Sequence, residues 1–261
     1  MSNKLFLPLL LCLSIVISSC KKKDSVNEEV VEKPIIKKVT LNGSWYWLGV
    51  PPQSNGEKLP VIVALHGDEG HPNNMKRFWE DLWKEKQDFI FVAPECPRGI
   101  CDKGGVNTWS KGEYDGSEPQ GEWLKSVIDQ VVTGHPADDK RIFAVGYSGG
   151  AIFLGYQGFK MFQNVFAGIQ WSCGGVNETE AQVYKAPDNP NCKVQGRVVI
   201  SRNGDISYLV TAADRIIEIL QNNGHANEFY DTGCDGHCCD ADKYSENTYN
   251  WFMSLSSLCE S

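Results

Sequence analysis

The sequence lacks an excess of basic residues, an apolar segment of membrane-spanning length and any internal repeat. Its 261 residues include 25 Lys and Arg against 33 Asp and Glu, for a formal net charge of −8. A nucleic-acid-binding surface needs clustered basic residues that displace counterions from phosphates, so this charge balance argues against nucleic acid as a partner. The absence of heptads, repeats and Pro-rich or Gly/Ser-rich tracts excludes coiled coils, solenoids and low-complexity chains. A hydrophobic content of 41% is typical of a globular protein, and the length suits one large α/β domain or two small ones.

The N-terminus has the pattern of an export signal. Lys4 precedes an apolar run over residues 5–17, which is too short for a membrane span of roughly 20 residues and typical of a signal-peptide core. The run ends in Ile17-Ser18-Ser19-Cys20, which resembles the lipobox of bacterial lipoproteins. That resemblance implies a signal peptide over residues 1–19 and a lipid on Cys20. An ordinary cleaved signal peptide is the alternative.

The residues after this signal favour a tethered, exported domain. Residues 20–39 are charge-rich and contain no aromatic side chain, a composition that predicts a flexible tether. No domain boundary is visible beyond the tether, so residues 40–261 are expected to form one domain. We expect a monomer, periplasmic or on the cell surface, held at the membrane by the lipid of Cys20.

The cysteine content supports an oxidising compartment. Of ten cysteines, Cys12 lies in the signal and Cys20 takes the lipid, which leaves an even number for disulfides in the exported domain. Cys96 with Cys101 and Cys173 with Cys192 are plausible local pairs. Cys238 and Cys239 are adjacent and are expected to take separate partners, since a bridge between neighbours is strained.

A metal site is the competing interpretation of the C-terminal cysteine cluster. Cys234, His237, Cys238 and Cys239 lie within six positions. Zinc ligands usually occur as two spaced pairs, and no second His/Cys pair with that spacing is present. We therefore expect neither a metal nor another cofactor.

Hydrophobic periodicity predicts an α/β fold. Residues 45–50 alternate and carry aromatics, as an antiparallel strand does. Residues 59–65 form a continuous apolar run, as a strand buried on both faces does. Further strands are expected at 89–93, 141–145, 166–171, 198–201 and 228–230, and helices at 76–86, 121–132, 151–162, 210–222 and 247–258. Alternation of strands with helices predicts a mostly parallel central sheet with helices on both faces.

The candidate nucleophile is Ser148. The expected strand at 141–145 runs into Gly146-Tyr147-Ser148-Gly149-Gly150 and then into a helix. A Gly-x-Ser-x-Gly turn between strand and helix holds the serine on a strained backbone, where its hydroxyl stands clear of the sheet. The pattern alone is weak, and the strand before it and helix after it make it specific.

A serine nucleophile needs a base and an acid that orients the base. In this architecture the chain order is Ser, acid, His. Asp205 follows the strand expected at 198–201, and His237 lies in the loop after the last strand. The other histidines come too early or lie at a helix end, so His237 is the candidate base. Asp235 is the rival acid.

Two backbone N–H groups are expected to stabilise an oxyanion. Gly149, directly after the nucleophile, supplies one. The other is expected from Asp68, in the loop His66-Gly67-Asp68-Glu69-Gly70 after the first buried strand. An acidic side chain is unfavourable beside an anion, so the Asp68 carboxylate has to point away. His66 is expected to be a buried ring that hydrogen-bonds the backbone of this loop.

These motifs together resemble the α/β-hydrolase superfamily, in particular the exported esterases that include polyhydroxybutyrate depolymerase-like and feruloyl-esterase-like enzymes. The resemblance rests on LPVIVALHG at 59–67, FVAPE at 91–95, GYSGG at 146–150 and the Gly236-His237 step. It implies hydrolysis of carboxylic esters through an acyl-enzyme. The acid loop departs from that group, because SRNGD stands where a His-Gly step usually precedes the Asp.

The sequence predicts the substrate only as a chemical class. The expected loops carry aromatic residues, of which Trp109, Tyr147 and Trp171 are the candidate substrate-binding residues, and packing in the core is the alternative role for each. Feruloyl or acetyl esters of polysaccharide, or polyester oligomers, are the expected substrates. A serine peptidase or amidase is one alternative, and a non-catalytic lipoprotein that binds glycan or a partner is another.

Overall fold

The computed structural model describes residues 34–259, apart from 53–55, 104–105, 110–117 and 240. The expected signal peptide, the expected lipidation site Cys20 and most of the expected tether lie outside the described residues. The described chain enters the sheet at Ile36, so residues 36–39 belong to a strand and not to the tether. No helix in the described part of the chain has the length and hydrophobicity needed to cross a bilayer.

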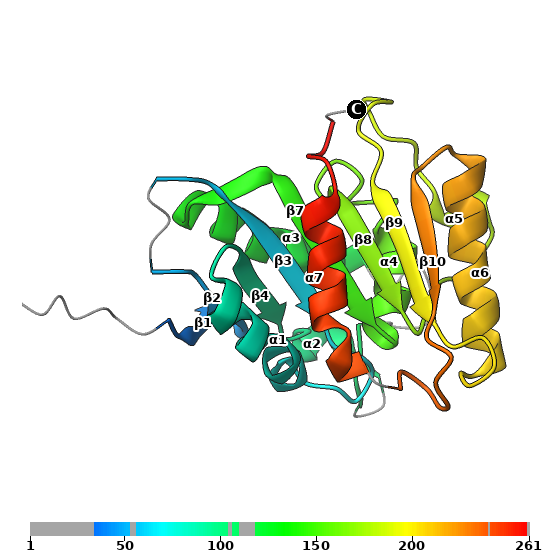
Figure 1. Ribbon diagram of the computed structural model, residues 1–261, viewed down its shortest axis with the longest axis horizontal. Coiled ribbons are helices and arrows are strands. Elements are labelled where there is room, and N and C mark those ends of the chain that lie inside the picture. Colours follow the sequence, from blue (N-terminus) through cyan, green and yellow to red (C-terminus); the bar gives the residue numbers. More distant parts are fainter. Residues whose placement is uncertain (1–33, 53–55, 104–105, 110–117, 240, 260–261) are drawn as a thin grey trace, which may run out of the picture. The chain divides into compact units, whose positions relative to one another are not determined.

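An eight-stranded sheet forms the centre of the domain (Figure 1). The strand order is β1-β2-β4-β3-β7-β8-β9-β10; β1, β2 and β4 pair antiparallel, and all pairs from β4 to β10 are parallel. Every residue of β3 is buried, because helices cover both faces of a parallel sheet. The strands are β1 (Ile36–Leu41), β2 (Ser44–Gly49), β3 (Leu59–Leu65), β4 (Ile90–Pro94), β7 (Ala137–Tyr147), β8 (Gly168–Ser172), β9 (Gln195–Ile200) and β10 (Asn227–Asp231), and a small separate ribbon pairs β5 (Asp102–Lys103) with β6 (Val106–Asn107).

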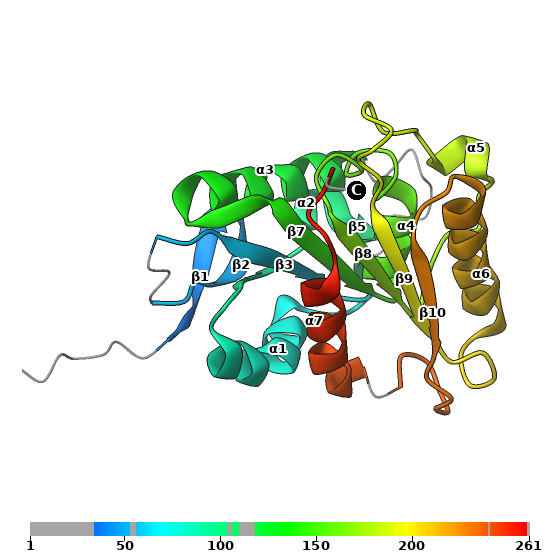
Figure 2. The same ribbon diagram turned by 45° about the horizontal axis from the view of Figure 1, so that its top comes forward.

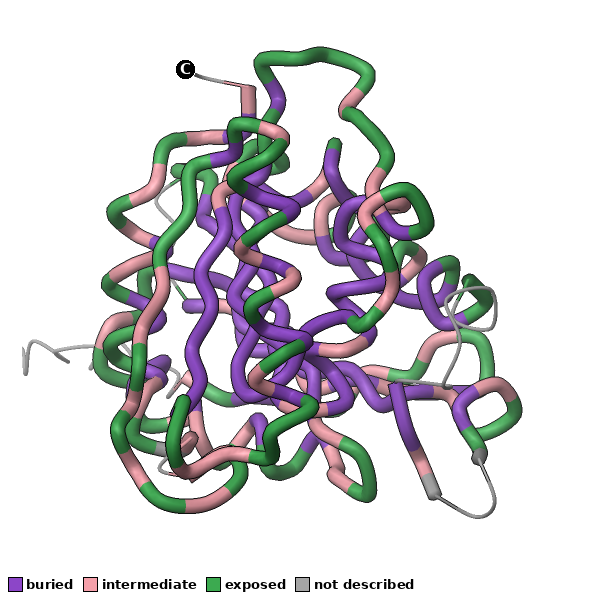
Figure 3. The backbone as a smooth tube through the Cα atoms, turned by 90° about the vertical axis from the view of Figure 1, so that its right-hand side faces the viewer, coloured by how far each residue is buried: buried purple, intermediate pink, exposed green. Residues whose placement is uncertain are grey.

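Helices cover the sheet on two sides (Figure 2). The apolar sides of α3, α4 and α6 pack in one core cluster, and those of α1 and α7 pack in the other. Figure 3 shows the buried backbone concentrated in the strands, with exposed stretches on the outer turns of the helices. The helices are α1 (Pro72–Lys86), α2 (Arg98–Cys101), α3 (Glu118–Gly134), α4 (Gly149–Gln157), α5 (Glu180–Val183), α6 (Ser207–Asn222) and α7 (Ser245–Ser254), with a 3₁₀ turn η2 at Ala241–Lys243.

The expected α/β class, with a mostly parallel sheet and helices on both faces, is confirmed. All seven strands and all five helices expected from periodicity are present; β3 has the expected bounds, and the other elements have shifted ends. The largest shift is in α4, which ends at Gln157 and not at residue 162. The chain there continues through turns that place Phe159 and Phe162 in the core.

Four disulfides join the eight cysteines of the domain: Cys96–Cys101, Cys173–Cys238, Cys192–Cys259 and Cys234–Cys239. The expected Cys96–Cys101 pair is present, and Cys238 and Cys239 take separate partners as expected. The expected pair of Cys173 with Cys192 is wrong. Cys173 directly follows the carboxyl end of β8, whereas Cys192 precedes the amino end of β9. Because the two strands are parallel, one cysteine lies at the carboxyl ends of the strands and the other at their amino ends.

Removing the Cys192–Cys259 disulfide should destabilise the fold without touching the carboxyl edge of the sheet. The bridge closes a loop with a sequence separation of 67 residues, and a cross-link of that length restricts the unfolded chain strongly. We expect Cys192→Ala with Cys259→Ala to lower the free energy of unfolding by about 2–4 kcal/mol, measured by urea unfolding. An unchanged unfolding midpoint would contradict a structural role for this bridge.

Candidate active site

Ser148 occupies a sharp turn between β7 and α4. Its backbone has φ 50° and ψ −113°, a positive φ that costs a non-glycine residue about 1–3 kcal/mol. The flanking glycines are required by close approach. A Cβ on Gly146 would stand 2.4 Å from the Gly150 carbonyl carbon, and a Cβ on Gly150 would stand 2.8 Å from the His66 carbonyl oxygen. The turn therefore excludes side chains at the two positions where the motif has glycine.

The structure brings Ser148, His237 and Asp205 together. His237 Nε2 lies 2.8 Å from Ser148 Oγ, and His237 Nδ1 lies 2.7 Å from Asp205 Oδ1. This arrangement suits a neutral imidazole whose Nδ1–H donates to the carboxylate while Nε2 accepts from the hydroxyl. The Asp205 side chain is 1% exposed and that of His237 is 32% exposed. Asp235, the rival acid, is exposed to solvent, and Asp205 holds the position beside Nδ1.

The acid loop and the histidine loop are joined directly by hydrogen bonds. Ser201 Oγ donates to the Cys234 carbonyl at 2.6 Å and accepts from Gly204 N at 3.1 Å. Gly236 N donates to the Gly204 carbonyl at 3.0 Å. Ser201 is 2% exposed, so its hydroxyl connects the two loops inside the protein. Sequence reasoning missed this link, because a serine at a strand end has no distinctive signal.

Two disulfides brace the histidine loop. Cys234–Cys239 closes the loop on itself, and Cys173–Cys238 ties it to the end of β8. Cys173 and Cys238 also form a close group with His237 whose geometry would suit a metal ion. Both sulfur atoms are bonded to each other, so they are not available as thiolate ligands.

The two predicted oxyanion donors lie next to each other. The backbone nitrogen of Asp68 is 2.9 Å from the point where a Cβ on Gly149 would stand, so the two residues meet beside Ser148. The Asp68 carboxylate lies against the Cα of Gly149 and accepts a hydrogen bond from the Thr108 hydroxyl. Thr108 is 2% exposed. Its bond fixes the position of the acidic side chain that sequence reasoning found unfavourable here.

His66 is a buried ring that supports this loop, as expected. It is fully buried, its Nδ1 lies 2.8 Å from the Gly67 carbonyl, and its ring packs against Trp109 with centroids 5.9 Å apart. Burial lowers the pKa of His66 from 6.5 to about 4, against an opposing effect of the bond to Gly67. The ring is therefore neutral at pH 7, and Nδ1 carries the proton that is donated to Gly67.

The three aromatic residues predicted to bind substrate are buried. Trp109 and Trp171 are both fully inaccessible to solvent; Trp109 packs on Phe153 and Trp171 stacks on Phe159. Tyr147 is 4% exposed. The structure thus places Trp109 and Trp171 in the core, the alternative role that the sequence left open, and Tyr147 in the wall beneath Ser148.

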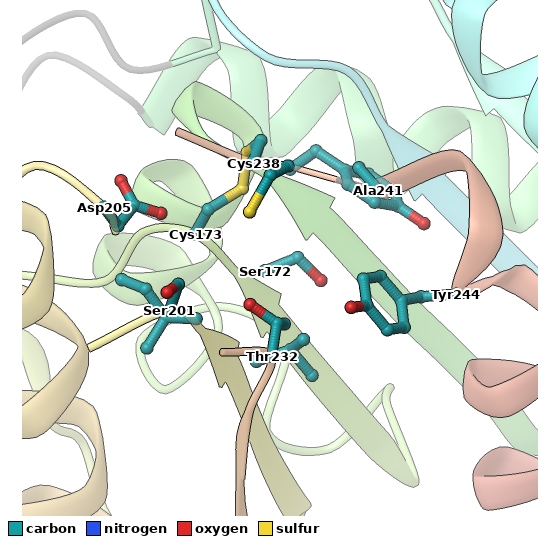
Figure 4. A pocket seen from close by; sticks show the side chains of 12 residues that line it. Ser172, Cys173, Ser201, Asp205, Thr232, Cys238, Ala241 and Tyr244 are labelled. Atoms are coloured by element: carbon teal, nitrogen blue, oxygen red, sulfur yellow. A yellow bond between two sulfur atoms is a disulfide. The ribbon is translucent and has the colours of Figure 1, made fainter. Parts of the chain in front are cut away.

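A small cavity lies beside Asp205 (Figure 4). Asp205, Tyr147 and the Cys173–Cys238 disulfide line it, and the side chains of Ser172, Thr232 and Tyr244 point toward it in Figure 4. Its volume of about 20 Å³ is enough for a single water molecule and too small for an acyl group.

Two exposed apolar side chains follow Asp205 in the chain. Ile206 is 43% exposed and Tyr208 is 57% exposed, and both belong to the three large hydrophobic residues that stand exposed in the described part of the chain. Ile206 directly follows the acid, and Tyr208 lies in the first turn of α6. Neither residue is among the substrate-binding candidates predicted from the sequence.

Comparison with solved structures identifies the architecture as the α/β-hydrolase fold. A CE1 ferulic acid esterase from Anaeromyces mucronatus, solved in complex with ferulic acid, superposes with a TM-score of 0.62 over 90% of this chain and 96% of its own, at 17% identity. A thermostable esterase superposes with a TM-score of 0.64 over 87% of this chain and 64% of its own, at 19% identity. A carboxylesterase from Bacillus cereus gives a TM-score of 0.59 over 80% and 93%, at 14% identity.

Sequence comparison finds a more restricted similarity. The chain is 28% identical over 138 residues to the bifunctional acetylxylan esterase/xylanase XynS20E of Neocallimastix patriciarum. The match covers 52% of this chain and 19% of that protein, so the chain corresponds to a minor part of that relative's length. No family model matches the sequence.

The buried His66 should make the fold sensitive to acid. Since its pKa is about 4 in the folded state and 6.5 when solvated, the unfolded chain binds a proton first as the pH falls. Stability contributed by the neutral ring is therefore present above pH 6.5 and is lost between pH 6.5 and 4, by about 3 kcal/mol in total.

The test is urea unfolding of the wild type and of His66→Asn across pH 4 to 7. The Asn amide retains a donor for the Gly67 carbonyl and does not titrate, so the variant should show a shallower decline of unfolding free energy with falling pH. Parallel declines in the two proteins would contradict the assignment.

Proposed function

We propose that the chain is a serine ester hydrolase that works through an acyl-enzyme on Ser148. The observation that carries the proposal is the imidazole of His237, which lies within hydrogen-bonding distance of both Ser148 Oγ and the buried Asp205 carboxylate. The strained Ser148 turn and the neighbouring backbone nitrogens of Gly149 and Asp68 support it. The α/β-hydrolase fold and the esterase activities named for its structural neighbours point to the same reaction class.

The proposed first step forms the acyl-enzyme. Ser148 Oγ attacks the ester carbonyl carbon while its proton passes to His237 Nε2. The negative charge that develops on the carbonyl oxygen is stabilised by the N–H groups of Gly149 and Asp68. Asp205 accepts the Nδ1–H bond throughout and favours the imidazolium. The tetrahedral intermediate then expels the alcohol oxygen, which takes the proton from Nε2.

The second step returns the enzyme to its starting state. A water molecule gives a proton to His237 Nε2 and attacks the acyl carbon. The acyl–oxygen bond to Ser148 then breaks, Ser148 Oγ regains the proton, and the carboxylic acid leaves. Water is the only co-reactant in these two steps.

The proposed substrates are feruloyl or acetyl esters carried by polysaccharide, with polyester oligomers as the second candidate. An acetylxylan esterase/xylanase and a ferulic acid esterase among the similar proteins favour the first group. The exposed side chains of Ile206 and Tyr208 beside Asp205 offer an apolar wall for an acyl or aryl group. The cavity beside Asp205 is too small for an acyl group, which supports this exposed surface as the acyl site.

The proposed setting is outside the cytoplasm. The four disulfides are consistent with an extracellular protein. We further propose that the mature chain is a monomeric lipoprotein, anchored in a bacterial membrane by a lipid on Cys20. Metabolic labelling with a radioactive or alkyne-bearing fatty acid tests this, since label on the wild type that is absent from Cys20→Ser supports the anchor.

Replacing Ser148 with Ala should abolish hydrolysis of a small activated ester. The nucleophile and base act as a unit, so kcat for 4-nitrophenyl acetate should fall by about 10⁴-fold or more in Ser148→Ala and similarly in His237→Ala. Ser207→Ala, at an exposed position near Asp205, and Asp235→Asn serve as controls and should retain activity. Loss in Asp235→Asn with retention in Asp205→Asn would contradict the assigned acid.

Removing the Cys173–Cys238 disulfide should lower activity more than stability alone explains. This bridge ties the loop of His237 to β8, so the double Ala variant frees the imidazole from its position. We expect kcat for 4-nitrophenyl acetate to fall about tenfold or more, because a misplacement of about 1 Å can cost 10²-fold. The matched control is the Cys192→Ala, Cys259→Ala variant, assayed well below its unfolding temperature. Equal kcat values in the two double variants would contradict the bracing role.

A further inference from the structure

A large groove lies on the described surface beside strands β1 and β2, away from the triad. Its volume is about 750 Å³. We call it the tryptophan groove and define it by Trp45, Trp47, His71, Glu95 and Arg98, which are among its lining residues. It lies between the β1–β2 hairpin, the start of α1 and the loop after β4. Nothing in the proposed reaction uses it.

The tryptophan groove opens at the same edge of the sheet as Ser148. Trp45 lies on β2, which runs antiparallel to β4, and its carbonyl accepts a bond of 3.0 Å from Glu95 N just beyond the carboxyl end of β4. The strand order from β2 to β7 is β2-β4-β3-β7. Three strand spacings of about 4.8 Å separate them, so the groove lies roughly 14 Å from the nucleophile along this edge.

A second cavity connects the groove to the oxyanion loop. It has a volume of about 330 Å³, shares His71, Glu95 and Arg98 with the tryptophan groove, and is also lined by Gly70 and Asn107. Glu69 N donates to the Asn107 carbonyl at 3.2 Å, which places this cavity directly beside the loop that carries Asp68. A chain-like ligand in the groove can therefore extend toward Ser148 without crossing the core.

Two acceptor groups line these cavities. Glu95 is 7% exposed and lines both of them. Asn107 Oδ1 is buried without a partner among the described residues. A buried polar atom without a partner is unfavourable, because it has lost its hydrogen bonds to water. Both sites thus favour a ligand that brings hydrogen-bond donors.

The aromatic rings of the groove present faces that a ligand can reach. The ammonium of Lys38, an exposed residue, lies 3.9 Å from the centroid of Trp45, and that of Lys76 lies 4.5 Å from the centroid of Trp47. Both lysines are flexible side chains that a ligand can displace. The Trp47 ring is held in place, since its Nε1–H donates to Asn73 Oδ1 at 2.9 Å. A preorganised aromatic platform reduces the cost of binding.

We propose that the tryptophan groove binds a neutral pyranose chain, the polysaccharide backbone whose ester group reaches Ser148. Pyranose rings combine apolar C–H faces, which pack on indole rings, with hydroxyl donors for Glu95 and Asn107. The Glu95 carboxylate makes binding of an anionic ligand unfavourable. The cations Lys38, Lys76 and Arg98 make binding of a cationic ligand unfavourable. This inference rests on the proposed ester hydrolysis and specifies the substrate class for it.

Binding is tested without catalysis in the Ser148→Ala background. Xylohexaose, cellohexaose and mannohexaose are titrated by calorimetry. At least one should bind, with affinity reduced about tenfold by Trp45→Ala and several-fold by Glu95→Gln. Trp251→Ala, a partly exposed tryptophan on α7 outside the groove, is the matched control and should bind normally. Absence of binding to all three, or binding that survives both groove substitutions, overturns the proposal.

Kinetics in the otherwise wild-type chain separate this proposal from the proposed function. On 4-nitrophenyl acetate, Trp45→Ala and Glu95→Gln should match the wild type. On a feruloylated or acetylated hexasaccharide, both variants should raise KM about tenfold with kcat unchanged. This is the effect of losing an interaction that stabilises the bound substrate and the transition state equally. Unchanged KM for the hexasaccharide overturns the groove and leaves the hydrolase intact. No hydrolysis of any ester, with sugar binding lost in Trp45→Ala, overturns the hydrolase and leaves the groove intact.

Discussion

The constraint on which the site depends is that one imidazole must lie between a hydroxyl and a carboxylate that come from distant parts of the chain. His237 meets Ser148 across 89 residues of sequence and Asp205 across 32. A parallel sheet makes this meeting possible, because the carboxyl ends of β7, β9 and β10 lie at one edge. The sheet brings the loops close together, and the loops then have to hold the side chains to within a fraction of an ångström.

A small number of local contacts hold these three side chains in position. The Ser148 turn is determined by the backbone packing around Gly146 and Gly150. Asp205 is buried, and Ser201 joins its loop to that of His237. The Cys173–Cys238 disulfide adds a covalent tie to β8. Because no residue from 232 to 239 is buried and this loop has no helix or strand, these ties replace the packing that a helix or strand would supply.

Much of the fold and the site could be predicted from the sequence, since the governing signals are local. The apolar run of β3 predicts its burial, and the Gly-x-Ser-x-Gly turn predicts the position of Ser148. What could not be predicted depends on where distant segments meet. Strand β1 has one buried residue, Ile36, and joins the sheet only as an edge partner of β2. Cys173 and Cys192 are close in sequence but lie at opposite ends of the parallel strands. Proximity along the chain therefore predicts the wrong disulfide pair.

The orientation of the aromatic side chains also could not be predicted from the local sequence. Trp109 follows β6 and Trp171 lies near the carboxyl end of β8, where pocket residues are often found, but both indoles are buried in the core. The accessible apolar and aromatic surface comes instead from Ile206, Tyr208 and the β2 tryptophans. Whether a side chain after a strand faces solvent depends on the rotation of the loop, which no periodic pattern in the sequence encodes.

The most direct measurement for the central claim is covalent capture of the nucleophile. The purified domain is treated with a fluorophosphonate, and the modified peptide is identified by mass spectrometry. A single adduct on Ser148, formed by the wild type and not by His237→Ala, is the predicted result. An unmodified wild type, or an adduct on another serine, would contradict the account.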